Sequence, residues 1–167
     1  THLFKTSILE NIRAARPEAG REQVLKAARA ARCEDILAKL PEGLDTVVGT
    51  KGIYLSGGEA QRIALARAIL KDAPVVVLDE ATAFADPENE ALIQKAFEVL
   101  TKGKTVLMIA HRLSTVQKAD CILVMDDGKV IQRGTHSSLL EQEGLYKKMW
   151  EDYLTSARWK VGKEADI

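Results

Sequence analysis

The sequence has no apolar run that could cross a membrane as a helix, since no stretch approaches the roughly 18 apolar residues that such a span needs. A secretory signal is also missing from its start, where no basic segment leads into an apolar one. We therefore expect a soluble chain. Any membrane role would depend on a partner or on further sequence.

Two further shortages limit the classes of function. Lys and Arg total 24, as do Asp and Glu, so no net field favours nucleic acid or an anionic membrane surface as a partner. Cysteine is scarce, and Cys33 and Cys121 lie far apart in patterned segments. This spacing argues against a disulfide or a metal pair and predicts reduced core thiols in a cytosolic protein.

Apolar residues, in contrast, are sufficient for a core, because they make up 46% of 167 residues. Residues 1–70 predict a helical lobe. Ser7 to Glu10 fits a capping box at the start of a short helix. Residues 22–31 are rich in helix formers, and a second helical piece over 34–40 stops before Pro41.

From residue 71 onward strands and helices alternate, which is typical of an α/β protein with a parallel sheet. We expect residues 71–154 to form this part and residues 155–167 a polar tail. The run from Val75 to Leu78 is wholly apolar and predicts a strand buried on both faces. Asp126-Asp127-Gly128 is most simply a hairpin turn. The expected elements are a strand over 75–78, a helix over 87–100, a strand over 105–110, a hairpin over 121–133 and short helices over 137–141 and 145–153.

Two adjacent carboxylates, Asp79 and Glu80, follow the first strand. The carboxyl ends of strands are where open α/β sheets bind ligands. One acid there could be a satisfied structural group. Two in succession, with Thr82 and Asp86 close behind, indicate instead a site for Mg²⁺ and a water molecule.

A second candidate site is the run Ser56-Gly57-Gly58-Glu59, which a long helix follows. The glycines let the backbone approach a ligand closely, and the amino end of a helix attracts anions. Ser56 and Glu59 also fit a capping box, so this motif alone is equally consistent with a well-capped structural helix.

The order of four motifs decides between these alternatives. They are Leu55 to Glu59, Gln61-Arg62, Val77 to Thr82 and Ile109 to Arg112. In this order they resemble the ATP-binding domain of ABC transporters, over essentially the whole chain. Ala110 to Thr115 and Gly134 to His136 are further similar to exporter-type members. The resemblance implies an α/β fold, in which the family's α-helical subdomain precedes the second half of a RecA-like P-loop NTPase core.

The resemblance also implies roles for individual residues in binding and hydrolysing MgATP. Glu80 would orient or deprotonate the attacking water, and His111 would contact the γ-phosphate. Asp79 would hold Mg²⁺ through water, and Asp86 would lie in the loop that crosses a dimer interface. Phosphoryl transfer requires mainly positioning and electrostatic stabilisation, which such groups supply. The family's signature, which would bind the γ-phosphate of ATP held by the opposite subunit, corresponds to Ser56, Gly57, Gly58 and Glu59.

Three features depart from the family pattern. Glu59 stands where glutamine is usual, and we expect its carboxylate to turn into the capping box. Ala83 to Asp86 replaces the usual Ser-Ala-Leu-Asp of the crossing loop. Thr50 stands where the loop before the signature usually has glutamate. Interface packing and contacts with a membrane domain are expected to differ at these places.

A phosphate-binding loop of the form Gly-x-x-x-x-Gly-Lys-Ser/Thr is absent. Gly103-Lys104-Thr105 resembles its end, but the first glycine would fall at Glu98, and a strand follows where a helix is required. In the family this Walker A loop and the glutamine of the Q-loop precede the matched region. We therefore expect a domain without roughly its first third, inactive alone, with an uncovered apolar sheet face that promotes self-association.

These observations predict the ATP-binding and ATP-hydrolysing domain of an exporter-type ABC transporter, using ATP and Mg²⁺ at the cytoplasmic face of the membrane. Its partners would be a second such domain, in a nucleotide-sandwich dimer, and a transmembrane domain, with no nucleic acid. One alternative is a soluble ABC-type ATPase acting on nucleic acid or ribosomes, although the chain lacks the long coiled coils or basic tracts usual there. The other is a non-catalytic interaction fragment, against which the intact Asp79, Glu80 and His111 argue.

Overall fold

The computed structural model describes residues 2–49, 53–79, 87–110 and 113–164. Contacts divide the chain into two compact units, with the division between Ile109 and Ala110. This division differs from the boundary predicted near residue 70, because the first two strands pack with the preceding helices. The predicted boundary refers to the lobes of a complete domain and stays a prediction.

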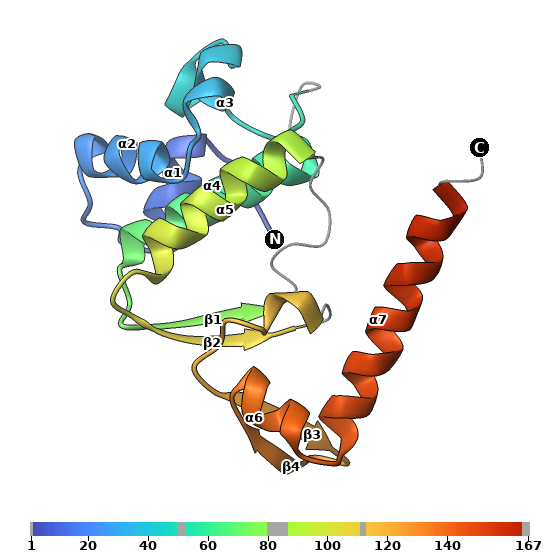
Figure 1. Ribbon diagram of the computed structural model, residues 1–167. Coiled ribbons are helices and arrows are strands. Elements are labelled where there is room, and N and C mark those ends of the chain that lie inside the picture. Colours follow the sequence, from blue (N-terminus) through green and yellow to red (C-terminus); the bar gives the residue numbers. More distant parts are fainter. Residues whose placement is uncertain (1, 50–52, 80–86, 111–112, 165–167) are drawn as a thin grey trace. The chain divides into compact units, whose positions relative to one another are not determined.

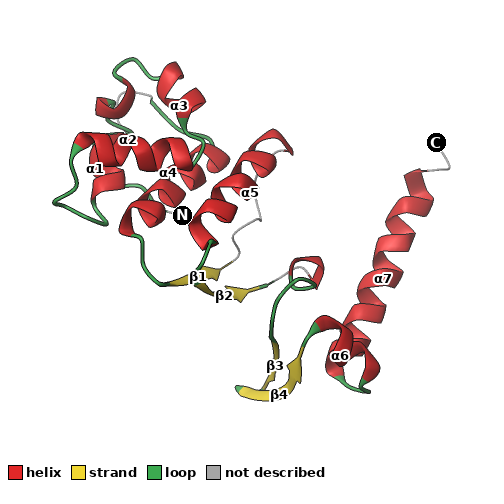
Figure 2. Ribbon diagram, turned by 60° about the vertical axis from the view of Figure 1, so that its left-hand side comes forward, coloured by secondary structure: helices red, strands yellow, loops and turns green. Residues whose placement is uncertain are grey.

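The first unit contains helices that lie on one side of a pair of strands (Figures 1 and 2). Its described elements are α1 (Ile8–Arg13), α2 (Arg21–Ala30), α3 (Glu34–Lys39), the 3-10 turn η1 (Gly43–Asp45), α4 (Gly57–Lys71), β1 (Val75–Asp79), α5 (Pro87–Thr101) and β2 (Thr105–Ile109). The helices and strands predicted for residues 22–40 and 75–110 are confirmed to within a residue or two.

Helix α1 begins where the sequence predicted a capping box, although only half of that box forms. The Ser7 hydroxyl accepts a hydrogen bond from the Glu10 backbone N–H at 3.2 Å. The Glu10 side chain does not reach back to the start of the helix; instead it pairs with Arg13, one turn further on. An arginine within reach thus competes successfully with the backbone for the carboxylate.

The core of the first unit is formed by one apolar stripe from each helix. Ile8 and Ile12 lie four residues apart on α1, which places both on the same face, and neither is exposed. Burying one such side chain contributes about 1.5–3 kcal/mol relative to leaving it in water. The other large members are Val24 on α2, Ile36 on α3, Ile63 on α4, and Ile93 and Leu100 on α5.

The carboxyl end of α4 is anchored to the sheet. Asp72 ends the helix in the left-handed conformation, with φ of 51°, and its N–H still bonds to the Ala68 carbonyl. Its carboxylate lies 2.8 Å from Lys104 Nζ, just before β2. The end of α4 and the start of β2 are therefore held together.

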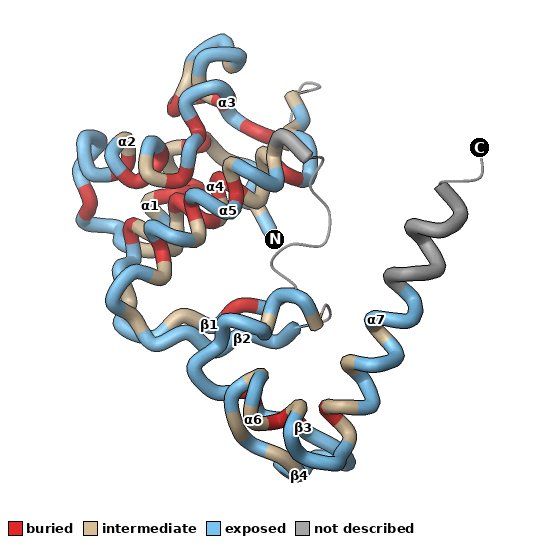
Figure 3. The backbone as a smooth tube through the Cα atoms, viewed as in Figure 1, coloured by how far each residue is buried: buried red, intermediate tan, exposed pale blue. Residues whose placement is uncertain are grey.

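Strands β1 and β2 are parallel, in register from Val75 opposite Thr105 to Asp79 opposite Ile109. Leu78 is buried against the helices, but Val75 and Val77 are 55% and 62% exposed (Figure 3). The prediction of a strand buried on both faces is therefore wrong for this chain. None of the described elements of this unit covers the second face, so the predicted uncovered apolar face is confirmed.

The second unit is built on an antiparallel hairpin. Its elements are the 3-10 turn η2 (Leu113–Thr115), β3 (Ile122–Asp126), β4 (Lys129–Gly134), α6 (His136–Glu141) and α7 (Leu145–Glu164). The predicted turn is confirmed, because Asp127 and Gly128 both have positive φ, at 45° and 72°. A separate small core joins the hairpin to the helices through Ile122, Val124, Leu139 and Tyr146.

Helix α7 is longer than the predicted helix over 145–153, since it continues to Glu164, into the tail expected over residues 155–167. No proline interrupts residues 154–164, which include several good helix formers. Among the residues that the structure describes, no helix is both long and apolar enough to cross a membrane.

The two cysteines have different environments. Cys33 is fully buried, as predicted, and burial raises the pKa of its thiol to about 12. Cys121 is exposed, so its predicted place in the core is wrong. Because successive residues of an extended chain point in opposite directions, burial of Ile122 turns Cys121 outward.

Candidate functional site

The run from Ser56 to Glu59 forms the amino end of α4. Ser56 is the extended N-cap residue, and its hydroxyl accepts from the Glu59 N–H at 3.2 Å. The Glu59 carboxylate in turn accepts from the Ser56 N–H at 2.9 Å. The predicted capping box is therefore confirmed. The N–H groups of Glu59 and Ala60 both bond to Ser56, so the capacity of this helix end to bind an anion depends on the N–H groups of Gly57 and Gly58.

The two glycines of this run serve different purposes. A Cβ atom at Gly58 would lie 2.9 Å from Cβ and Cγ of Asn89, at the start of α5. Gly58 therefore allows α4 and α5 to pack closely. A Cβ atom at Gly57 would meet nothing within 4 Å, so this glycine leaves backbone N–H groups open to a ligand.

Each oxygen of the Glu59 carboxylate has a partner. Besides the Ser56 N–H, its carboxylate approaches Lys39 Nζ, at 3.5 Å, in the last turn of α3. Its side chain is only 18% exposed. The carboxylate is thus turned into the capping box, as expected.

Arg62 ties the start of α4 to the connection between α2 and α3. Its side chain is 1% exposed, and two of its nitrogens donate to the two oxygens of Asp35 at 2.6 and 2.9 Å. It also donates to the Arg32 carbonyl, while its Nε has no hydrogen-bond partner among the residues that the structure describes. Burial opposes the charge of Arg62, but the hydrogen bonds to Asp35 raise its pKa overall. The same bonds lower the pKa of the Asp35 carboxyl.

Asp79 ends β1 at the same edge of the sheet as Ile109, the last residue of β2. The residue is exposed, and a carboxylate is the kind of ligand that Mg²⁺ takes. Among the described residues, no three potential metal-ligating side chains cluster together. Glu80, Asp86 and His111 lie outside the described residues, so their roles stay predictions.

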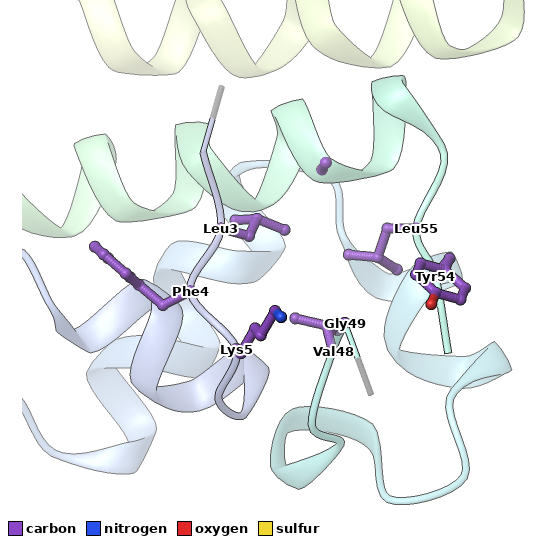
Figure 4. A pocket seen from close by; sticks show the side chains of 8 residues that line it. Leu3, Phe4, Lys5, Val48, Gly49, Tyr54 and Leu55 are labelled. Atoms are coloured by element: carbon purple, nitrogen blue, oxygen red, sulfur yellow. The ribbon is translucent and has the colours of Figure 1, made fainter. Parts of the chain in front are cut away.

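A pocket of about 160 Å³ lies between the amino-terminal segment and the loop before α4 (Figure 4). Phe4 and Tyr54 give it two aromatic walls, and among the described residues Lys5 is the only charged one that lines it. The segment around Phe4 is fixed by Asn11, whose Oδ1 accepts from the Phe4 N–H at 2.8 Å. This lining suits an apolar side chain better than a phosphate. The pocket is formed by Leu3, Phe4, Lys5, Val48, Gly49, Tyr54, Leu55 and Ala60.

Comparison with known proteins gives this arrangement a family. Residues 1–83 match the ABC transporter family. The chain is 53% identical over 149 residues to the ATP-dependent lipid A-core flippase of Vibrio cholerae, covering 89% of this chain and 26% of the flippase. A bacterial Atm1-family ABC exporter with ATP bound superposes with a TM-score of 0.78 at 43% identity, covering 90% of this chain and 26% of that one.

The chain belongs to the ABC transporter family. It spans about a quarter of the length of the flippases that it matches. Over 149 residues it is also 53% identical to the mycobactin import ATP-binding/permease protein IrtA of Mycolicibacterium thermoresistibile, of which it covers 16%. The predicted exporter-type ATP-binding domain and its partial P-loop NTPase fold are thereby confirmed.

Within this ABC transporter fold, sequence reasoning missed one residue that positions the signature helix. Arg62 belongs to one of the four motifs, but nothing next to it in the sequence indicates its partner. The available signal was weak: an arginine on the buried stripe of α4, one residue before Ile63, and an acid in the first turn of α3. Because Arg62 and Asp35 lie 27 residues apart, their pairing depends on how the helices pack.

Proposed function

We propose that this chain is part of an ATP-binding and ATP-hydrolysing domain that powers transport by an ABC transporter. The observation that supports the proposal is the amino end of α4, where the signature run forms a capped helix start with Ser56 and Gly57 exposed. It lies within a chain whose relatives include an exporter with ATP bound. ATP would be the substrate, and Mg²⁺ would supply positive charge to offset the negative charge of its phosphates.

In this proposal the residues divide the work between two copies of the domain. Ser56, Gly57 and Gly58 would donate hydrogen bonds to the γ-phosphate of ATP held by the opposite domain. Glu59 would complete the signature run, with its carboxylate in the capping box. Asp79 would hold Mg²⁺ through water. Glu80 would orient the attacking water, His111 would contact the γ-phosphate, and Asp86 would lie at the interface.

The proposed partners are a second ATP-binding domain and a transmembrane domain at the cytoplasmic face of the membrane. The pocket beside Phe4 and Tyr54 supports the second of these, because its apolar lining fits a hydrophobic side chain of a docking segment. The relatives include a lipid A-core flippase and a mycobactin import protein, so the same kind of ATP-binding segment accompanies different cargoes. The proposal therefore concerns energy conversion and names no cargo.

The test is MgATP hydrolysis by this chain beside the complete transporter that contains it. We expect the complete protein to hydrolyse ATP and the isolated chain to neither bind nor hydrolyse it, because these 167 residues contain no phosphate-binding loop. Glu80→Gln should lower the rate of the complete protein by about 100-fold or more. Glu98→Gln, at an exposed position of α5, should leave the rate unchanged. Saturable MgATP binding by the short chain, or equal rates for both variants, would refute the proposal.

A further inference from the structure

The glutamate of the signature run introduces a charge into a site proposed to bind phosphate. Glu59 occupies the first turn of α4, the turn whose N–H groups would receive the γ-phosphate. A carboxylate and a phosphate at such short range repel each other, and partial burial of the carboxylate strengthens that repulsion. With 18% of its side chain exposed, Glu59 is poorly screened by water. A site containing Glu59 therefore needs a compensating cation.

In the described part of the chain, Arg62 and Lys39 are the two cations that interact with Glu59. Arg62 is one turn further along α4, and the charge of Glu59 contributes to its raised pKa. The guanidinium, however, is already committed to the two oxygens of Asp35 and to the Arg32 carbonyl. Its charge is thus largely offset within its own pair.

Lys39 is placed differently. Its Nζ lies 3.5 Å from Glu59 Oε1, and within the described part of the chain this is the one ion pair that involves Lys39. The lysine is on α3, a separate element, so its reach to Glu59 depends on the packing of α3 against the start of α4. The other carboxylate oxygen, Oε2, is held by the Ser56 N–H at 2.9 Å. Lys39 and Ser56 together fix the direction in which the carboxylate points.

We propose that Lys39 is a positioning residue of the nucleotide site: it neutralises Glu59 and holds it in the capping box, so that the open end of α4 can receive a triphosphate. The inference rests on the proposed function. It concerns the glutamate in the signature run of this chain, and it predicts that Lys39 matters only while residue 59 is acidic.

The experiment is a double-mutant cycle in the complete transporter, measured in two ways. The first readout is the KM and kcat of ATP hydrolysis. The second is the dissociation constant of a fluorescent ATP analogue with Mg²⁺, in a Glu80→Gln background where hydrolysis is blocked. Lys39→Met should raise KM and the dissociation constant about two- to fivefold, the range expected for one exposed ion pair. It should leave kcat and the thermal midpoint nearly unchanged, because Lys39 is 68% exposed.

Three companion variants make the result specific. Lys39→Arg should restore binding, since it keeps the charge. Lys26→Met removes a lysine from an exposed position of α2 and should have no effect. In a Glu59→Gln background, Lys39→Met should cause no further change.

The outcomes separate this inference from the proposed function. An effect of Lys39→Met that persists in the Glu59→Gln background, or no effect in either background, overturns the role of Lys39 while ATP hydrolysis by the parent stands. A complete protein that neither binds nor hydrolyses MgATP in any variant overturns the proposed function, and this inference with it.

Discussion

The buried ion pair between Arg62 and Asp35 should contribute strongly to the stability of the first unit. The Arg62 side chain is 1% exposed. In Asp35→Ala its guanidinium would keep the Arg32 carbonyl as its remaining described partner. Breaking a fully buried pair costs about 3–5 kcal/mol. Because the Asp35 side chain is itself 43% exposed, water partly screens the pair, and we expect a loss of about 2–3 kcal/mol.

The chain contains a matched control with the same chemistry and a different environment. Arg21 donates two hydrogen bonds to Asp45, at 2.8 and 2.7 Å, so the geometry resembles that of the buried pair. Both of these side chains are more than half exposed, at 57% and 52%. Asp45→Ala should therefore cost less than about 1 kcal/mol.

Urea unfolding of the wild type and the two variants measures this difference. Both variants should shift the transition midpoint with an unchanged slope, and the shift should be clearly larger for Asp35→Ala. Equal midpoint shifts for the two variants would show that burial of Arg62 does not increase the contribution of its ion pair with Asp35 to stability. That result would refute the reasoning.

The stability difference between wild type and Asp35→Ala should decrease at low pH. Hydrogen bonds from Arg62 lower the pKa of Asp35 in the folded state. The resulting stabilisation is fully present above the unfolded pKa of about 3.9 and is lost as the pH falls through the folded pKa. The difference in the free energy of unfolding between wild type and Asp35→Ala should therefore be constant near neutral pH. It should become smaller only below about pH 4.

Two further predictions follow from packing. Gly58→Ala should destabilise the fold by about 1–3 kcal/mol, because the new Cβ would lie 2.9 Å from Asn89. Gly57→Ala should be tolerated, since a Cβ there meets nothing within 4 Å. Equal unfolding midpoints for the two variants would contradict this difference. The isolated chain should self-associate through the uncovered face of β1 and β2, and the double substitution Val77→Lys and Leu107→Lys should reduce the association, as measured by light scattering over a concentration series. A wild-type chain that stays monomeric at high concentration would contradict the second prediction.

Local rules in the sequence predicted much of the fold. The capping box of Ser56 and Glu59 depends on residues three apart, so it could be recognised before any tertiary structure was known. The turn at Asp127 and Gly128 and the start of α5 at Pro87 are likewise local. In each of these features prediction and structure agree.

Features set by distant contacts could not be predicted in this way. The pairing of Arg62 with Asp35 needs α3 and α4 to be packed, and the reach of Lys39 to Glu59 needs the same packing. The prediction that β1 is buried on both faces was wrong, because an apolar run shows only that a strand can be buried. It does not show how many layers of structure cover that strand. Glu10 shows that even local contacts can be ambiguous. Its carboxylate could bond to the backbone at the start of α1 or pair with Arg13, and the sequence did not show which of the two forms.

The anchored end of α4 has a mechanical consequence. The helix has 15 residues and is therefore about 22 Å long, with the proposed phosphate-binding end at Gly57 and the fixed end at Asp72, paired with Lys104. A tilt of about 10° around the fixed end would move the opposite end by about 4 Å, which exceeds the length of a hydrogen bond. Under the proposed function, a small tilt of α4 would therefore be enough to bring the signature run onto a phosphate or to withdraw it.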